Sequence, residues 1–365
     1  MPERCAIVGS GLASLAAYAT LRHGGVAAGE IAVFGTHEDP TEVWRTRAAA
    51  IRQRWMRSES DGHLAAPSFP GLAVRAALRR RDPRPLLESV TNRYHPTVEE
   101  FLRHGDEVRA RSGWEQSFRH HVVRRIRTVD DGFELDGEGP FAHVLVATGH
   151  PGLALPDELA GDPRVVHAYQ PHDYAPSVVV VGAGMAAATE WLNALAAGSE
   201  VVSVRRREPL RRPLNVPRPL FSKRGLTAFH RATPERRAAL LRELSTPSYP
   251  PGASWDEPLA AAEREGRFRV EPAANGAAQI ICATGFRRGY RHDSLLERLV
   301  LEHALATHDR WLVLADDSTV PQLTTPARTL ALAGVAGQWA FPASDTIAGA
   351  KYAARAFLRR ICRTR

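Results

Sequence analysis

Two copies of one pattern constrain the fold of this chain more than any other feature. In each copy a short apolar run ends in Gly-x-Gly, an alanine-rich stretch with helical spacing follows, and a second apolar run closes the unit. The copies lie at residues 4–35 and 177–205. Four consecutive valines at 178–181 suit a strand that is buried on both faces, as the central strands of parallel sheets are. Each copy therefore predicts a strand–helix–strand unit with a tight glycine turn after its first strand.

The glycine spacing predicts a cradle for a diphosphate. The first glycine permits the tight turn, the second lets a pyrophosphate approach the backbone, and the helix N-terminus supplies N–H donors and a positive dipole end. The third glycine of the pattern is replaced by a small residue in both copies. The alternative is a pair of glycine-punctuated units with no ligand. The predicted cradle residues are Gly9, Ser10, Gly11, Leu12 and Ser14 in the first copy and Gly182, Gly184, Met185 and Ala187 in the second.

Two segments that end in Ala-Thr-Gly also repeat each other, at 141–152 and 277–289, so glycine patterns and Ala-Thr-Gly segments alternate along the chain. A further apolar run follows at 329–337. An amphipathic helix is then predicted over 344–360, with Ser344 as its N-cap and Asp345 in its first turn.

Two long regions separate these landmarks. Residues 45–130 are rich in arginine and are predicted to be helical in part. Residues 207–262 contain nine prolines and one predicted helix near 234–244. Insertions of this length in α/β folds usually shape a substrate site or a lid.

The end of the second strand in each copy indicates which dinucleotide is bound there. In the second copy Arg205 and Arg206 follow the strand, and guanidinium groups suit a 2′-phosphate, so NADP is favoured over NAD. In the first copy Gly35 stands where a carboxylate would bind a ribose hydroxyl. Glu38 and Asp39 follow closely and are predicted to reach the ribose, Glu38 being the candidate contact.

Together these landmarks resemble the two-dinucleotide-binding flavoproteins, and among them the single-component class B flavin monooxygenases. That group comprises flavin-containing monooxygenases, Baeyer–Villiger enzymes and ornithine/lysine N-hydroxylases. Trp44 follows Gly35 much as a Trp follows the acid in the family's GGxW segment. Residues 159–174 resemble the family's FxGxxxHxxx(Y/W) linker, with Gly161 and His167 on its Gly and His and Leu159 in place of its Phe.

The resemblance implies an α/β fold of two Rossmann-like dinucleotide-binding domains, with the NADPH domain inserted into the FAD domain. The FAD domain is then 1–170 plus 300–365, and the NADPH domain is 171–299 with the proline-rich insertion 207–262. FAD belongs in the first cradle and NADPH in the second. The further cofactor contacts implied are Trp44, Met56, Arg57 and Ser58 near the flavin, Thr148 and Gly149 between the nucleotides, Thr284 and Gly285 beside NADPH, and Asp345, Thr346 and Ile347 toward the flavin ring.

The implied activity is an FAD-dependent, NADPH-using monooxygenase that transfers one oxygen atom from O2 to a small-molecule substrate, by N-, S- or Baeyer–Villiger-type oxygenation. No catalytic residue is marked. One alternative is an FAD-dependent NAD(P)H reductase that passes electrons to a ferredoxin or a quinone. Another is a non-catalytic nucleotide-binding or redox-sensing protein. Trp44 is either a core residue or a cofactor contact, and His167 is either a satisfied linker histidine or a proton shuttle.

Composition narrows the classes further. Cys5, Cys282 and Cys362 are widely separated, which argues against a disulfide framework, a zinc site and a vicinal dithiol, and places the chain in a reducing compartment, the cytoplasm. The net charge of +8 comes almost entirely from arginine, and no nucleic-acid recognition motif accompanies it. No apolar run is long enough for a membrane span. We therefore expect neither nucleic acid nor a membrane as a partner.

Overall fold

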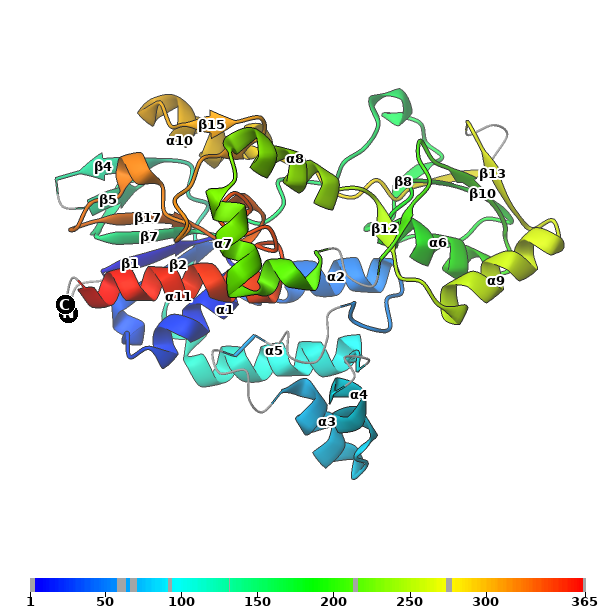
Figure 1. Cartoon of the computed structure of the whole chain (residues 1–365), viewed down its shortest axis with the longest axis horizontal. Helices are drawn as coiled ribbons and strands as arrows, with labels where there is room; N and C mark the ends of the chain where they lie inside the picture. Colours follow the sequence, from blue (N-terminus) through cyan, green and yellow to red (C-terminus); the bar gives the residue numbers. More distant parts are fainter. Residues whose placement is uncertain are drawn as a thin grey trace.

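The computed structural model describes residues 4–57, 64–65, 71–90, 94–130, 132–212, 216–273 and 278–363. Both predicted strand–helix–strand units are present in it. Each unit is the nucleus of a separate five-stranded sheet, so the predicted α/β fold with two Rossmann-like cores is confirmed (Figure 1). The first unit is β1 (Cys5–Val8), α1 (Leu12–His23) and β2 (Ile31–Gly35), and the second is β9 (Ser177–Val181), α6 (Met185–Ala196) and β10 (Glu200–Val204).

The first sheet is parallel throughout, with the strand order β17-β7-β1-β2-β3. Alternate residues of its strands enter two cores, one on each face. Three helices, α1, α5 and α11, cover one face, and a three-stranded antiparallel sheet and α10 lie on the other. The elements added here are β3 (Phe118–His120), β4 (Ile126–Val129), β5 (Gly132–Leu135), β6 (Glu138–Phe141), β7 (His143–Val146), β17 (Thr329–Leu332), α5 (Val98–Ser112), α10 (Ser294–His303) and α11 (Ile347–Arg363).

The second sheet is also parallel, with the order β13-β10-β9-β14-β8. Val178, Val179 and Val180 of its central strand are fully buried, as the valine run predicts. On one face Trp191 of α6 packs edge-on against Phe268, and α9 completes the cover. The remaining elements are β8 (Val165–His167), β13 (Phe268–Glu271), β14 (Gln279–Cys282) and α9 (Ala253–Arg264).

The described parts of the two long regions contain mainly helices, with a few short strands. The arginine-rich region is helical in part, as predicted, and the helix predicted near 234–244 is α8 (Pro234–Leu244). Residues 207–262 pack against both sheets. α9 packs on α6 of the second sheet, whereas Phe229 and Leu241 are buried in the core of the first sheet. In Figure 1 the green helices of this region lie over the middle of the molecule. The remaining elements are α2 (Glu42–Ala50), α3 (Leu72–Arg80), α4 (Arg84–Val90), α7 (Lys223–Arg231), β11 (Leu210–Arg211), β12 (Ser248–Tyr249), β15 (Thr307–His308) and β16 (Trp311–Leu312).

The start of the last helix differs from the prediction. Ser344 does not cap it, because its buried hydroxyl donates to the Gly334 carbonyl instead. Thr346 caps the helix instead: its hydroxyl accepts from the Gly349 N–H at 3.2 Å and donates to the Ala343 carbonyl at 2.7 Å. Asp345 therefore precedes the helix rather than lying in its first turn.

Candidate functional site

The first glycine cradle lies where β1 passes into α1. Gly9 has φ +116°, and a Cβ there would come within 3.0 Å of the Ala147 carbonyl in the Ala-Thr-Gly segment after β7. Gly11 is extended, and a Cβ on it would meet nothing within 4 Å. No side chain caps α1, and its first turn holds no acidic residue. The positive end of the helix dipole therefore faces open space beside Gly11.

The second cradle has the same construction. Gly182 has φ +142°, and its Cβ would lie 2.5 Å from the Ala283 carbonyl in the other Ala-Thr-Gly segment. The nearest atom to a Cβ on Gly184 is Cβ of Pro247, at 3.9 Å, and no side chain caps α6. In both units the first glycine accommodates the neighbouring strand and the second leaves room for a ligand. This arrangement fits two diphosphates, and it explains why the Gly-x-Gly and Ala-Thr-Gly motifs occur in pairs.

The residues around the first cradle explain the missing acid at the end of β2. Ser10 is buried, and its hydroxyl accepts a hydrogen bond from the His37 N–H at 3.1 Å. A Cβ on Gly35 would come within 3.0 Å of that hydroxyl. The position therefore admits only glycine while Ser10 occupies this place. Glu38, the predicted substitute, is exposed and accepts from Arg109 at 3.3 Å.

Small side chains fill the third position of both glycine patterns. Ser14 and Ala187 are fully buried, which fits the close packing of helix on strand that the motif requires. Leu12 and Met185 open their helices and are partly exposed.

The residues predicted near the flavin ring make contacts of several kinds. Trp44 is partly buried and packs edge-on against Phe101, with ring centroids 4.9 Å apart, and Met56 is buried in the same core. Arg57 reaches the second half of the molecule, where it donates to the Arg212 carbonyl at 3.0 Å. Burial lowers its pKa to about 10. Ser58 lies outside the described residues.

The two arginines predicted to bind a 2′-phosphate differ in exposure. Arg205 is mostly buried, pairs with Glu208 at 2.8 Å and lies over the Trp191 ring. The Arg206 side chain is 88% exposed and pairs at 3.3 Å with Glu158. An exposed surface pair of this kind contributes little energy. Arg206 is therefore the one whose guanidinium is readily available to a ligand.

The chain segments that leave the two Ala-Thr-Gly motifs pair with each other at the junction of the two sheets. The Ala154 N–H donates to the Gly285 carbonyl at 3.0 Å, and the Arg287 N–H donates to the Gly152 carbonyl at 2.9 Å. The Thr284 hydroxyl donates to the Ala154 carbonyl. On the other segment the Thr148 hydroxyl donates at 2.6 Å to Asp293, the N-cap of α10. Of the predicted residues, Thr284 and Gly285 thus take part in this pairing, whereas Thr148 and Gly149 lie just before its other segment.

A stack of rings spans this junction. His150, directly after Gly149, stacks on Phe286, directly after Gly285, with centroids 4.2 Å apart and planes 15° apart. Tyr169 stacks on Phe286 at 4.9 Å, and the Arg47 guanidinium lies 4.7 Å from the centre of the same ring. Sequence reasoning missed these four residues. The sequence offered one clue to them: His150 and Phe286 each directly follow an Ala-Thr-Gly motif, so they occupy equivalent positions in the two segments.

The two histidines at the junction are in different states. His167 donates from Nε2 to the Gly285 carbonyl at 3.0 Å and accepts the Tyr169 N–H on Nδ1 at 3.1 Å, so it is a satisfied linker histidine. His150 has a buried Nδ1 with no partner among the described residues. Burial, with the Arg288 and Arg47 cations, lowers the pKa of His150 to about 4, so its ring is neutral at pH 7.

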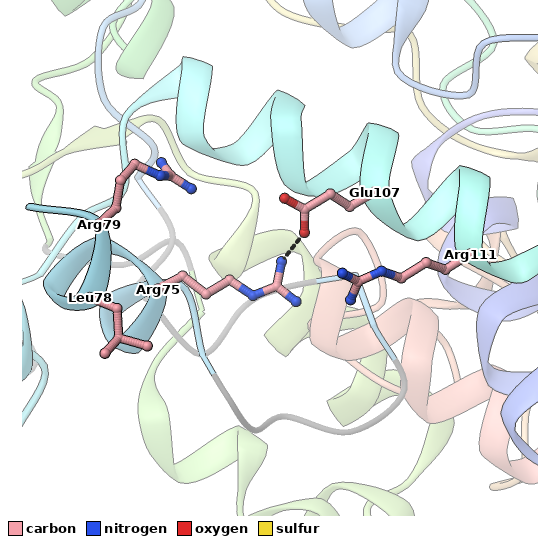
Figure 2. Close-up of a pocket in the computed structure, with 5 residues that line it drawn as sticks. All are labelled: Arg75, Leu78, Arg79, Glu107 and Arg111. Atoms are coloured by element: carbon pink, nitrogen blue, oxygen red, sulfur yellow. Dashed lines mark hydrogen bonds and ion pairs between the residues drawn. The ribbon is translucent and has the colours of Figure 1, made fainter.

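A surface cleft lies elsewhere, between α3 and α5 (Figure 2). Its volume is about 480 Å³, and an Arg75–Glu107 ion pair crosses it. It is open to solvent and contains none of the predicted site residues. The residues that line it are Arg75, Leu78, Arg79, Glu107 and Arg111.

The cysteines are placed apart from one another. Cys5 is buried in β1 and Cys282 in β14, on different sheets, while Cys362 is exposed near the end of α11. Burial raises the pKa of Cys282 to about 11, which makes it a poor nucleophile. Within the described ranges no three metal-binding side chains gather, and none of the helices there is long and apolar enough to span a bilayer.

The sequence profile of the pyridine nucleotide-disulphide oxidoreductases matches residues 3–223, more than half of the chain, and the chain belongs to this family. It is therefore an enzyme of the flavin-dependent oxidoreductase class that uses FAD and NAD(P)H, as the sequence predicts. No curated protein matches the chain.

Solved structures extend the comparison to the whole fold. The ornithine hydroxylase from Pseudomonas aeruginosa is 17% identical with a TM-score of 0.72, and the match covers 99% of this chain and 100% of that one. The ornithine N-hydroxylase from Kutzneria sp. 744 is 16% identical with a TM-score of 0.74 at the same coverage. The bacillithiol disulfide reductase from Bacillus cereus is 15% identical with a TM-score of 0.59, and 99% of each chain is covered. The predicted resemblance to two-dinucleotide-binding flavoproteins of the class B monooxygenase group is confirmed.

Proposed function

We propose that this protein is an FAD-dependent, NADPH-using monooxygenase that inserts one oxygen atom from O2 into a small-molecule substrate. The observation that carries the proposal is the construction of two matched diphosphate cradles whose partner segments meet at one junction. A flavin held by one cradle and a nicotinamide held by the other can approach each other only at such a junction. The similarity to two amine hydroxylases over almost the whole chain favours oxygenation as the outcome.

FAD supplies the redox chemistry with O2 when it is bound, and this chain's residues bind and orient it. Gly9, Ser10, Gly11, Leu12 and Ser14 hold its pyrophosphate against the uncapped end of α1, and Glu38 contacts its ribose. The backbone at Asp345, Thr346 and Ile347 presents the N-terminus of α11 to the ring, where it stabilises negative charge. Trp44, Met56 and Arg57 would lie near the ring.

The second cradle binds NADPH through Gly182, Gly184, Met185 and Ala187. Arg206 binds the 2′-phosphate because its guanidinium is exposed at the carboxyl end of β10, and Arg205 supports it from its partly buried position. Thr284 and Gly285 border this nucleotide, and Thr148 and Gly149 lie between it and the flavin. The stacked rings at the junction help to exclude water from the reacting atoms.

The division into domains follows from this assignment. The FAD domain is residues 1–170 plus 300–365, and the NADPH domain is 171–299. β8, near the end of the first FAD segment, pairs with β14 of the second sheet and so links the two domains just before their boundary. Residues 207–262 belong to the NADPH domain in sequence, while α7 and α8 pack on the FAD domain and connect the two.

A reductase is the second candidate, because the bacillithiol disulfide reductase from Bacillus cereus shares the fold. In that case reduced flavin passes its electrons to another acceptor, such as a ferredoxin or a quinone. A dithiol within this chain does not fit, since Cys5 and Cys282 are buried in separate sheets. None of Cys5, Cys282 and Cys362 forms a disulfide, which also favours the cytoplasm as the compartment of either enzyme.

One experiment distinguishes the monooxygenase from the reductase. The purified protein is reduced anaerobically with NADPH and then mixed with O2 in the presence of amines, sulfides or ketones, while NADPH consumption, product and hydrogen peroxide are measured. One substrate class that gives one oxygenated product per NADPH supports the monooxygenase. Rapid reduction of an added ferredoxin or quinone, with only hydrogen peroxide formed in its absence, would favour the reductase. A protein that binds no flavin would refute both.

A further inference from the structure

The imidazole of His150 is packed within a group of stacked side chains. It stacks on Phe286 with planes 15° apart, and Phe286 is in turn stacked on Tyr169 and covered by the Arg47 guanidinium. His150 follows β7 of the first sheet, whereas Phe286 follows β14 of the second. The ring is therefore fixed at the point where the two halves of the molecule meet.

The Nδ1 atom of this ring is buried and has no hydrogen-bond partner in the described part of the chain. Buried polar atoms are almost always paired, because leaving one unpaired destabilises the protein. His167, which stacks on Tyr169 in the same group, shows the ordinary state, with both ring nitrogens paired. The contrast indicates that Nδ1 of His150 awaits a ligand.

The surroundings restrict that ligand. Burial, together with the nearby Arg288 and Arg47 cations, lowers the pKa of the ring and keeps it uncharged, so Nδ1 is a neutral group suited to an amide or a hydroxyl rather than an ion. The two cradles contact the Ala-Thr-Gly segments at Ala147 and Ala283, and each of these alanines stands three residues before one of the stacked rings, His150 or Phe286. His150 is fixed through Phe286, which directly follows Gly285 at the edge of the second cradle. The ring therefore keeps its place relative to the second nucleotide.

We propose that His150 is a positioning residue whose Nδ1 hydrogen-bonds the nicotinamide half of the bound nucleotide, at its carboxamide or its ribose. The stack of Phe286 and Tyr169 presents the imidazole in the required orientation. This inference rests on the assignment of NADPH to the second cradle, and it requires no oxygenation step.

The test measures binding by the FAD-loaded, oxidised protein without turnover. Two probes are titrated: NADP+, and adenosine 2′,5′-bisphosphate, which carries the adenosine half but no nicotinamide. His150→Phe keeps a flat ring for the stack and removes both nitrogens. We expect it to weaken NADP+ binding about tenfold and to change the bisphosphate affinity less than twofold. Arg206→Ala is the matched control and should weaken both probes.

A second variant separates hydrogen bonding from packing. His150→Asn restores a polar atom near the place of Nδ1 and should recover most of the NADP+ affinity that the Phe variant loses. His150→Leu takes the place of the Phe variant if that protein does not retain FAD. Equal effects of His150→Phe on the two probes would overturn the proposal. So would an unchanged NADP+ affinity with an altered flavin absorption spectrum, because Nδ1 would then face the flavin. A wild-type protein that binds NADP+ but oxygenates nothing would refute the proposed function and leave this result standing.

Discussion

Replacing Gly11 by Val is expected to empty the flavin site without unfolding the protein. The backbone at Gly11 is extended, with φ −91° and ψ −169°, a conformation that valine adopts readily. A Cβ there meets nothing within 4 Å, so the substitution introduces no clash in the protein itself. The only thing that the new methyl groups can displace is the ligand that occupies this space.

The expected size of the effect follows from the bonds that the pyrophosphate would lose. Losing two charge-assisted hydrogen bonds from the first turn of α1, at about 1.5–3 kcal/mol each, removes about 3–6 kcal/mol of binding energy. That corresponds to about a 10²- to 10⁴-fold weaker FAD affinity. The cost to folding is smaller, about 0.5–1 kcal/mol, since an apolar residue is only a poorer N-cap than glycine.

The assay is the ratio of flavin to protein after purification, followed by FAD titration of the apoprotein and a thermal melt. Gly9→Ala is the matched control, because its Cβ would collide with the Ala147 carbonyl at a left-handed φ. It should destabilise the fold by about 2–5 kcal/mol whether or not FAD is present. Full flavin occupancy in Gly11→Val would refute the cradle, as would a thermal melt as damaged as that of Gly9→Ala.

Three further outcomes are expected. Arg206→Ala should raise the KM for NADPH at least tenfold and leave the KM for NADH within twofold; equal effects on both would remove the 2′-phosphate assignment. Gly35→Ala should destabilise the protein by about 1–3 kcal/mol in urea unfolding, and Ser10→Gly in the same chain should recover part of it, because the two side chains compete for one space. Burial lowers the pKa of His172, but the Glu190 carboxylate 3.1 Å from its Nε2 and the hydrogen bond from Nδ1 to the Gln170 carbonyl together raise it, so its folded pKa lies above 6.5. The stability from this pair is complete below pH 6.5 and is lost as the pH rises through the folded pKa. Melting temperatures from pH 6 to 9 should show this decline in the wild type and a flatter profile in His172→Asn.

Local pattern was sufficient to predict the sheets and the glycine turns. A run of four valines predicts a strand that is buried on both faces, and glycines after a strand permit a tight turn. Both predictions depend only on residues that are neighbours in the sequence. The pairing of each Gly-x-Gly with an Ala-Thr-Gly segment was visible as a repeat. Its cause, the contact of Gly9 with Ala147 and of Gly182 with Ala283, required the order of the strands in the sheets.

The sequence was a poorer guide to the hydrogen-bond and ion-pair partners of individual side chains. Ser344 has the ideal side chain for an N-cap, yet a buried carbonyl ten residues away takes its hydroxyl, and Thr346 caps the helix instead. Arg205 and Arg206 look equivalent in sequence, but one is mostly buried over Trp191 and the other is exposed. A hydrogen bond or a ring contact forms with whatever the fold brings near.

The sequence by itself determined the two strand–helix–strand units, their glycine cradles and the class of cofactor that such cradles bind, because these rest on backbone geometry within about thirty residues. Only the tertiary structure decided why Gly35 carries no side chain and which rings meet between the domains. Ser10 and Gly35 come together through adjacent strands, and His150 and Phe286 through two separate sheets. Contacts between residues so distant along the chain are fixed by the packing of whole elements, which no local pattern records.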